Sequence, residues 1–73
     1  MLKNFPFLEK LVRLELQDNK ILTGLNYIAE RCPSLEILKL TNNYISSVSE
    51  VAKLAPLRAT LFTLDLLGNP VCE

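Results

Sequence analysis

The 73-residue sequence contains no histidine, two glycines and two cysteines. Histidine is the side chain most often used as a general base or metal ligand, so its absence removes the commonest arrangements of both kinds. Gly24 and Gly68 are far apart, which excludes a glycine-rich loop that would hold a phosphate group. Cys32 and Cys72 lack the spacing of a zinc site. We therefore expect a protein that is not an enzyme, with no catalytic residue, no cofactor and no metal ligand.

An excess of one charge and a long apolar run are also missing. Eight basic residues balance eight acidic residues, so the chain lacks the positive surface of a nucleic-acid-binding protein. No apolar run approaches the roughly 20 residues that span a bilayer, and residues 1–10 lack the features of a signal peptide. Two cysteines do not make a disulfide framework, which favours a reducing compartment. We expect an intracellular protein, in the nucleus, the cytoplasm or both, without direct contacts to nucleic acid or membrane.

One eleven-residue pattern occurs three times in phase. It reads L-x-x-L-x-L-x-x-N-x-I in residues 35–45, and residues 11–21 and 61–71 repeat it, with Val71 in the last place. Its asparagines, Asn19, Asn43 and Asn69, are 24 and then 26 residues apart. These spacings lie within the period of about 20–29 residues that is typical of leucine-rich repeats. The pattern predicts an α/β leucine-rich repeat solenoid, with a short parallel sheet on its concave side and short helices on its convex side.

The repeats divide one domain, residues 1–73, into the segments 11–34, 35–60 and 61–73. Pro6 and Pro56 each stand thirteen positions before an asparagine of the pattern, so we interpret residues 1–10 as the remnant of a preceding repeat. Terminal repeats normally carry a capping element, and none follows the third repeat. We therefore expect a chain truncated at its C-terminal cap that self-associates through uncapped ends.

Each repeat is expected to contribute one strand, near residues 13–16, 37–40 and 63–66, with its leucines pointing inward. One repeat alone cannot bury these leucines, but stacked repeats form a continuous core. Adjacent strands lie about 4.8 Å apart, so the three asparagines should form a ladder whose amides bind backbone groups of the turns. A buried amide without a partner costs roughly 1–3 kcal/mol, which makes this ladder structural.

The connection from the first strand to the second, which we call the first crossover, should be a helix. Pro33 follows this helix and prevents its continuation. One face of that helix carries Leu25, Ile28, Ala29 and Cys32. Cys32 is therefore expected to be buried as a small apolar residue. At the N-terminal end of the core, before the first repeat, Phe5 and Phe7 are expected to cover the leucines.

The second crossover is less regular. Ser47 and Glu50 match a capping box, in which Ser47 caps the helix and Glu50 bonds back to the helix start. A short helix, including a turn of 3₁₀ helix, should then run up to Pro56. Its residues include Val48, Val51, Ala52, Leu54 and Ala55.

The outward strand positions form three rows on the predicted concave face, beside Asp18 and Asn42. The rows are Arg13, Ile37 and Thr63; Glu15, Lys39 and Asp65; and Gln17, Thr41 and Leu67. Repeat arrays use such surfaces to bind proteins, so these residues are the predicted partner-binding site, with Ile37 and Leu67 as exposed apolar anchors and Lys39 at the centre.

Glu15 and Asp65 should lie two strands apart, at roughly the 10 Å separation of an acid–base pair. Lys39 stands between them on an open surface without a pocket. The row is therefore interpreted as a Glu15–Lys39–Asp65 charge ladder rather than as a catalytic pair.

Two segments read LELQDNK (residues 14–20) and AERCPSL (residues 29–35). With Gly24-Leu25 and residues 35–43 they closely resemble the leucine-rich domain of the acidic leucine-rich nuclear phosphoprotein family, over roughly residues 5–66. The resemblance implies an intracellular, largely nuclear, non-enzymatic protein. It also implies protein partners, namely histones and a serine/threonine phosphatase that the family inhibits.

The end of the chain departs from that family. The family's acidic tail, which carries much of its histone binding, is absent, and Gly68-Asn69-Pro70-Val71 is more similar to the last repeat of the spliceosomal U2 A-prime and dynein light-chain types. Those types imply a module that docks an RNA-binding or motor partner. A fragment with no function of its own is the third interpretation.

Overall fold

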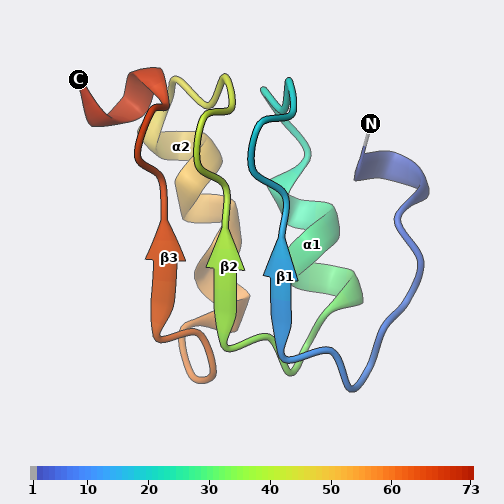
Figure 1. Cartoon of the computed structure of the whole chain (residues 1–73). Helices are drawn as coiled ribbons and strands as arrows, with labels where there is room; N and C mark the ends of the chain where they lie inside the picture. The colour runs from blue at the N-terminus through green and yellow to red at the C-terminus, as the bar shows by residue number, and fades with distance from the viewer. Residues whose placement is uncertain (1) are drawn as a thin grey trace.

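The computed structural model describes residues 2–73, and its centre is a parallel sheet of three strands. The strands β1 (Arg13–Glu15), β2 (Ile37–Lys39) and β3 (Thr63–Asp65) are adjacent in the order in which they occur along the chain (Figure 1). The middle leucine of each strand is in register with that of its neighbour. The predicted strand positions and their parallel pairing are therefore confirmed.

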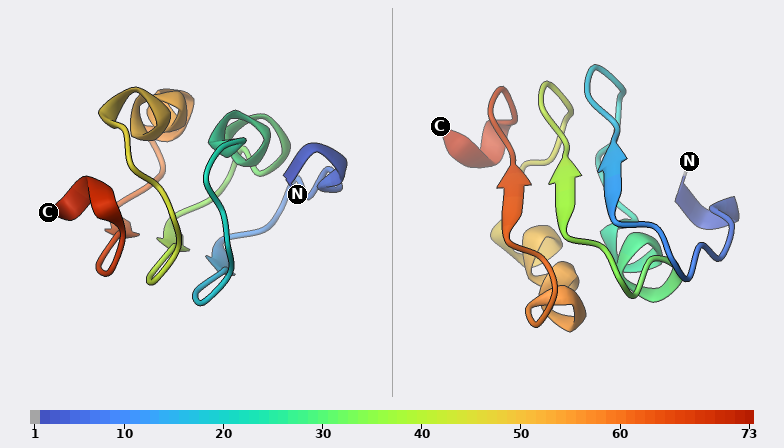
Figure 2. Two further views of the ribbon diagram at one scale, coloured as in Figure 1. Left: turned by 90° about the horizontal axis from the view of Figure 1, so that it is seen from above. Right: turned by 60° about the horizontal axis from the view of Figure 1, so that its bottom comes forward.

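The helices lie together on one side of this sheet, as the view from above shows (Figure 2). After β1 comes α1 (Leu25–Arg31); after β2 comes α2 (Val48–Val51), which continues directly into the 3₁₀ helix η2 (Ala52–Leu57). Two further 3₁₀ helices, η1 (Leu2–Asn4) and η3 (Pro70–Cys72), lie at the two ends of the row of strands. No helix within residues 2–73 is long and apolar enough to cross a membrane.

The apolar core fills the space between the sheet and the helices, and the second repeat supplies its middle. Leu35, Leu38 and Leu40 are all 0% exposed. The inward face of α1 packs on them through Leu25, Ile28, Ala29 and Cys32. The helical spacing predicted this face, including the burial of Cys32. Burial also raises the pKa of the Cys32 thiol, which keeps it protonated and unreactive.

Asn43 joins the first two repeats. Its amide nitrogen donates to the carbonyl oxygen of Leu16 at 2.9 Å and to that of Leu40 at 3.0 Å, while its oxygen accepts from the Ile21 N–H at 3.1 Å. The side chain is 2% exposed. The bonds to Ile21 and Leu40 are buried and the bond to Leu16 is partly buried, so the Asn43 side chain satisfies backbone groups that have little or no access to water.

Asn69 repeats this arrangement one strand further on. Its oxygen accepts from the Ile45 N–H at 3.0 Å, and its nitrogen donates to the carbonyl oxygen of Leu40 at 2.7 Å. Asn19 is exposed and bonds carbonyl groups of its own turn, those of Leu16 and Gln17. The predicted asparagine ladder is therefore confirmed between repeats at Asn43 and Asn69, whereas Asn19 bonds within one repeat.

Glu50 has a different role from the one its sequence pattern indicates. Its backbone N–H does donate to the Ser47 hydroxyl at 3.0 Å, as a capping box requires. Its carboxylate, however, accepts from the Leu25 N–H at 2.8 Å, at the start of α1 in the preceding repeat. The reason lies at Gly24, the N-cap of α1, which has no side chain to accept this bond. Glu50 therefore caps the neighbouring helix.

The environment of Glu50 favours its ionised form. Burial opposes ionisation, but the hydrogen bond and the charge of Lys53, whose Nζ lies 2.8 Å from the carboxylate, together with the N–H groups of Leu25 and Gly24, outweigh it. They hold the pKa of the Glu50 carboxyl below its ordinary value. A charged acceptor at a helix N-terminus also interacts favourably with the helix dipole.

The second crossover corrects a further expectation. Pro56 does not stop the helix, because it lies inside η2, where the fixed φ of proline matches the 3₁₀ conformation. Among the predicted helix residues Val48 is 76% exposed and Leu54 is buried, and Leu57, beyond Pro56, is buried as well. Leu54 and Leu57 are three apart, the period of a 3₁₀ helix. The predicted 3₁₀ turn is confirmed, and the helix is longer than predicted, because it continues through Pro56 to Leu57.

The N-terminal segment is held against α1 by Arg31. Its guanidinium donates to the carbonyl oxygens of Lys3 at 2.6 Å and Phe5 at 3.0 Å. Leu2 is buried there and Phe5 partly so, whereas Phe7 is 63% exposed. The expectation that both phenylalanines cover the core is therefore wrong for Phe7, and Leu2 takes that position beside Gly24.

Candidate protein-binding face

The structure brings the predicted binding residues together on the side of the sheet opposite the helices, which we call the outer sheet face. In register, Arg13 aligns with Ile37 and Thr63, and Glu15 aligns with Lys39 and Asp65. Beyond the strands, backbone bonds continue the alignment, from Asp18 N–H to the Thr41 oxygen at 2.9 Å and from Asn42 N–H to the Leu67 oxygen at 2.8 Å. The outer sheet face comprises Arg13, Glu15, Gln17, Ile37, Lys39, Thr41, Thr63, Asp65 and Leu67.

Exposure differs across this face. The three residues of the first repeat are exposed, and those of the middle repeat are half-buried between their neighbours. Lys39 lies in the central strand with a strand on each side. Leu67 is 68% exposed, but Ile37 is half-buried. The face therefore offers one strongly exposed apolar anchor, Leu67, rather than the two that were expected.

The charges on the outer sheet face pair along β1 rather than across the sheet. The Arg13 Nε lies 2.5 Å from a carboxylate oxygen of Glu15, and the Gln17 amide donates to the other at 3.2 Å. The hydrogen bond from Arg13 is the main reason why the pKa of Glu15 lies below its ordinary value, and Lys39 has a lesser effect. The interpretation of Glu15, Lys39 and Asp65 as a ladder of direct ion pairs is therefore wrong.

Lys39 is free of ion pairs within the described part of the chain, where the ion pairs are Arg13–Glu15 and Lys53–Glu50. Asp65 accepts a hydrogen bond from the Leu67 N–H at 3.0 Å, which fixes the start of the turn after β3. Lys39 thus remains available to a partner at the centre of the face.

A second ladder runs along the edge of this face, one residue before the asparagine ladder. Asp18, Asn42 and Gly68 have φ values of 61°, 58° and 80°. The Asn42 amide donates to the Asp18 carboxylate at 3.0 Å. A Cβ atom on Gly68 would lie 2.0 Å from the Asn42 side-chain oxygen, so a larger residue does not fit. Asp, Asn and Gly are the residues that best tolerate positive φ. Their occurrence at the same position of each repeat is the sequence signal from which this second ladder could have been predicted.

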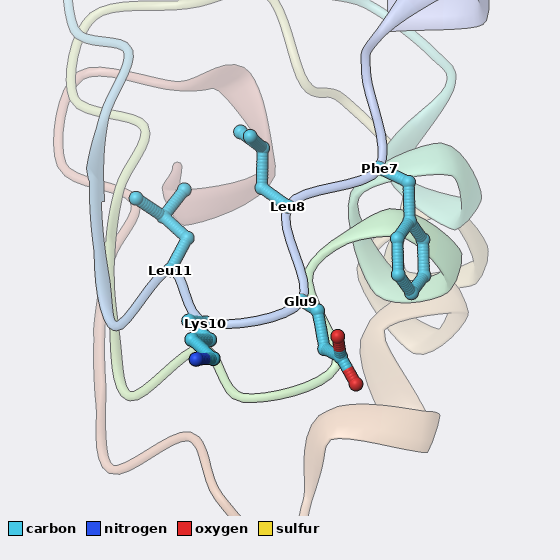
Figure 3. A pocket seen from close by; sticks show the side chains of 5 residues that line it. All are labelled: Phe7, Leu8, Glu9, Lys10 and Leu11. Atoms are coloured by element: carbon cyan, nitrogen blue, oxygen red, sulfur yellow. The ribbon is translucent and has the colours of Figure 1, made fainter.

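A shallow hollow of about 460 Å³ lies at the N-terminal side of the molecule (Figure 3). It is lined by one continuous segment, Phe7 to Leu11. Leu8 and Leu11 point to one side of that segment, while Phe7 and Glu9 point to the other. Binding sites for small molecules usually combine apolar walls with convergent polar groups from several elements, whereas this hollow is lined by a single segment.

Among residues 2–73, no three histidine, cysteine, aspartate or glutamate side chains are grouped as metal ligands.

Comparison with known families agrees with the repeat pattern and the sheet. A family model described as leucine-rich repeat matches residues 1–73, which is the whole chain. The chain belongs to the leucine-rich repeat family. Leucine-rich repeat domains are typically non-enzymatic modules for protein–protein interaction, and the extended outer sheet face is the kind of surface that such modules use.

Proposed function

We propose that this leucine-rich repeat chain is a non-enzymatic interaction module that binds a partner protein through its outer sheet face. The observation that carries the proposal is the register of the three strands, which aligns side chains from all three repeats on one surface. Lys39 lies at the centre of that surface without an ion pair among residues 2–73. Central positions of an interface tend to contribute most to affinity.

We further propose that the repeats form part of a solenoid whose concave side is the outer sheet face, and that the protein acts inside the cell, in the nucleus, the cytoplasm or both. The resemblance to the acidic leucine-rich nuclear phosphoproteins supports histones and a serine/threonine phosphatase as the first partners to test. Its most specific segment, residues 29–35, is the end of α1 and the return to β2.

A second candidate is a module that docks an RNA-binding or motor partner. It is favoured by the geometry of Gly68-Asn69-Pro70-Val71, the segment that departs from the nuclear phosphoproteins. Here η3 begins at Pro70, and the Val71 N–H donates to the Ile45 oxygen at 2.9 Å. The third repeat is thereby tied back to the second.

The test compares a charge reversal on each side of the molecule. Lys39→Glu changes the centre of the outer sheet face, and Glu30→Lys changes an exposed position on α1. The immobilised chain is incubated with nuclear extract, bound proteins are identified, and the affinity of each variant for the purified partner is measured. We expect Lys39→Glu to lower the affinity for an acidic partner or to raise the affinity for a basic partner. Glu30→Lys should leave the affinity unchanged.

The sign of the Lys39→Glu effect reports the charge of the partner, so purified core histones, which are basic, are included beside the captured protein. Both variants are expected to fold, because a charge reversal at a solvent-accessible position costs about 1 kcal/mol or less. Circular dichroism verifies this. The proposal is wrong if Glu30→Lys abolishes binding while Lys39→Glu binds like the unaltered chain.

A further inference from the structure

The charged groups of the outer sheet face differ in what they already bind. Glu15 accepts a hydrogen bond on each carboxylate oxygen, one from Arg13 and one from Gln17. Asp65 accepts from a backbone N–H of its own turn at 3.0 Å. Lys39 lies in register between these two carboxylates and has no ion pair among residues 2–73. The centre of the face therefore carries an unpaired cation between carboxylates that already accept hydrogen bonds.

The setting of Lys39 strengthens what it can bind. It is half-buried, because β1 and β3 lie on both sides of its strand. A partly buried charge is screened less by water and salt than a charge on an exposed rim. An ammonium group has three N–H donors and no acceptor, and its strongest hydrogen bonds are to negatively charged oxygen atoms. The group that complements Lys39 is therefore an anion.

The neighbouring carboxylates restrict which anion fits. Adjacent strands lie about 4.8 Å apart, so Glu15 and Asp65 are close to Lys39 on either side. A phosphate group carries more negative charge than a carboxylate, and a run of acidic residues carries several charges. Either would bring additional negative charge toward Glu15 and Asp65, and like charges in facing positions are unfavourable. A single carboxylate avoids this repulsion.

Ile37 supplies an apolar surface beside this cation. It lies two residues before Lys39 on the same face of β2, about 6.6 Å away along the strand. Arg13 and Thr63 lie on either side of it in register, and it remains half-buried rather than fully covered. An apolar group placed over Ile37 would remove this surface from water, which is favourable.

We propose that the outer sheet face recognises a protein segment in which a single acidic side chain lies close to an apolar side chain. The carboxylate binds the Lys39 ammonium, and the apolar side chain covers Ile37. This inference rests on the proposed function and specifies the chemistry of its partner. A segment offers such a pair when the apolar residue lies two positions away in a strand or one turn away in a helix, since both separations are about 6 Å.

Two immobilised peptide libraries of equal length test the charge of the partner. They differ only in the central residue, which is glutamate or lysine, and the positions on each side are randomised. The unaltered chain should retain the glutamate library more strongly, whereas Lys39→Glu should prefer the lysine library. Lys39→Met keeps a long side chain without the charge, and it should raise the dissociation constant of the selected glutamate peptides roughly 3- to 30-fold.

The matched control is Arg58→Glu, which reverses a charge at the exposed end of η2 on the helix side of the molecule. It should leave the dissociation constants unchanged. Ile37→Thr tests the apolar contact separately. Peptides selected by the unaltered chain should carry an apolar residue near the central glutamate, and Ile37→Thr should reduce this enrichment while the preference for glutamate remains. Circular dichroism verifies the fold of each variant; if Ile37→Thr does not fold, Lys39→Met decides alone.

Several results would overturn the inference. One is stronger retention of the lysine library by the unaltered chain, and another is equal binding of the glutamate peptides by Lys39→Met and the unaltered chain. A third is a basic protein, core histones included, that binds Lys39→Glu more tightly than the unaltered chain. These results leave the proposed function standing, because it does not specify the charge of the partner. If neither library is retained, the inference is overturned, and capture from nuclear extract decides the proposed function separately.

Discussion

Leu38 in the second repeat and Leu64 in the third occupy the same place in the repeated pattern and lie in register in adjacent strands. Leu38 is 0% exposed, whereas Leu64 is 37% exposed. The same contrast separates Leu35 and Leu40 from their counterparts in the third repeat, which are partly buried. Burial at these positions thus depends on having a repeat on both sides.

The hydrogen bonds show the same dependence. Asn43 bonds backbone groups of the repeat before it, and the exposed Asn19 bonds its own turn. Glu50 supplies a cap to α1 that Gly24 cannot provide. A repeat is therefore completed by groups from its neighbour, which explains why such repeats are stable only when stacked.

The largest expected effect is the difference between truncating Leu38 and truncating Leu64. Leu38→Ala removes fully buried methyl groups and should lower the free energy of unfolding by roughly 2–5 kcal/mol. Leu64→Ala removes groups that already contact water and should lower it by about 1–2 kcal/mol. Urea denaturation followed by circular dichroism measures both. Should Leu38→Ala leave no folded protein, the milder pair Leu38→Val and Leu64→Val should keep the same order, and equal losses would contradict the comparison.

The next largest effect concerns the two asparagines. Asn43→Ala leaves the Ile21 N–H and the Leu16 and Leu40 oxygens without their side-chain partner, and we expect a loss of roughly 2–3 kcal/mol. Asn19→Ala should cost about 1 kcal/mol or less, because Asn19 is exposed and water can replace it. Thermal unfolding of both variants checks the difference. If Asn19→Ala lowers the free energy of unfolding more than Asn43→Ala does, the asparagines stabilise the chain mainly through their own turns and not through the neighbouring repeat.

A smaller effect is expected where the second and third repeats approach most closely. Gly68→Ala combines positive φ with a clash against the Asn42 side chain and should cost roughly 1–2 kcal/mol. In an Asn42→Ala background the side-chain oxygen and carbon at 2.0 and 3.0 Å are gone and only the Cα of residue 42, at 3.2 Å, remains close, so the same substitution should cost less. A double-mutant cycle measures this coupling. Equal costs in both backgrounds would mean that backbone conformation alone excludes alanine at position 68.

The smallest effect is the pH dependence that Glu50 contributes. Its pKa is lower in the folded than in the unfolded chain, so its stabilisation is fully present above the unfolded value and is lost as pH falls through the folded value. At neutral pH, Glu50→Gln should cost about 1 kcal/mol, as loss of a helix cap does. The difference from the unaltered chain should shrink in acid, as urea titrations at several pH values can show. Glu30→Gln, the same substitution at an exposed position of α1, is the control variant for these titrations.

Strand positions, their register and the buried asparagines could be predicted because each follows from a short period within one repeat. The hydrogen-bond partner of the Glu50 carboxylate could not be predicted, because a capping box and a cap for the neighbouring helix use the same residues. The deciding feature, Gly24 at the start of α1, becomes relevant only when the two crossovers lie side by side. The length of the second crossover helix could not be predicted either, because proline ends an α-helix but fits within a 3₁₀ helix.

For the candidate site, the alignment of the nine residues followed from the strand period, but their pairing did not. Arg13 and Glu15 are two apart on one strand, so both point outward, and their side chains meet each other rather than Lys39. Such choices depend on side-chain rotamers, which the repeat pattern does not specify.

Amide hydrogen exchange tests most directly whether neighbours on both sides stabilise a repeat. At concentrations where the chain is monomeric, the Leu40 and Ile45 amides, which donate to Asp65 and Asn69 of the next repeat, should be among the slowest to exchange. The Leu64 amide faces the edge of β3 that has no neighbouring strand among residues 2–73, so it should exchange much faster than these two amides. Exchange at Leu64 as slow as at Ile45 under those conditions would contradict the account.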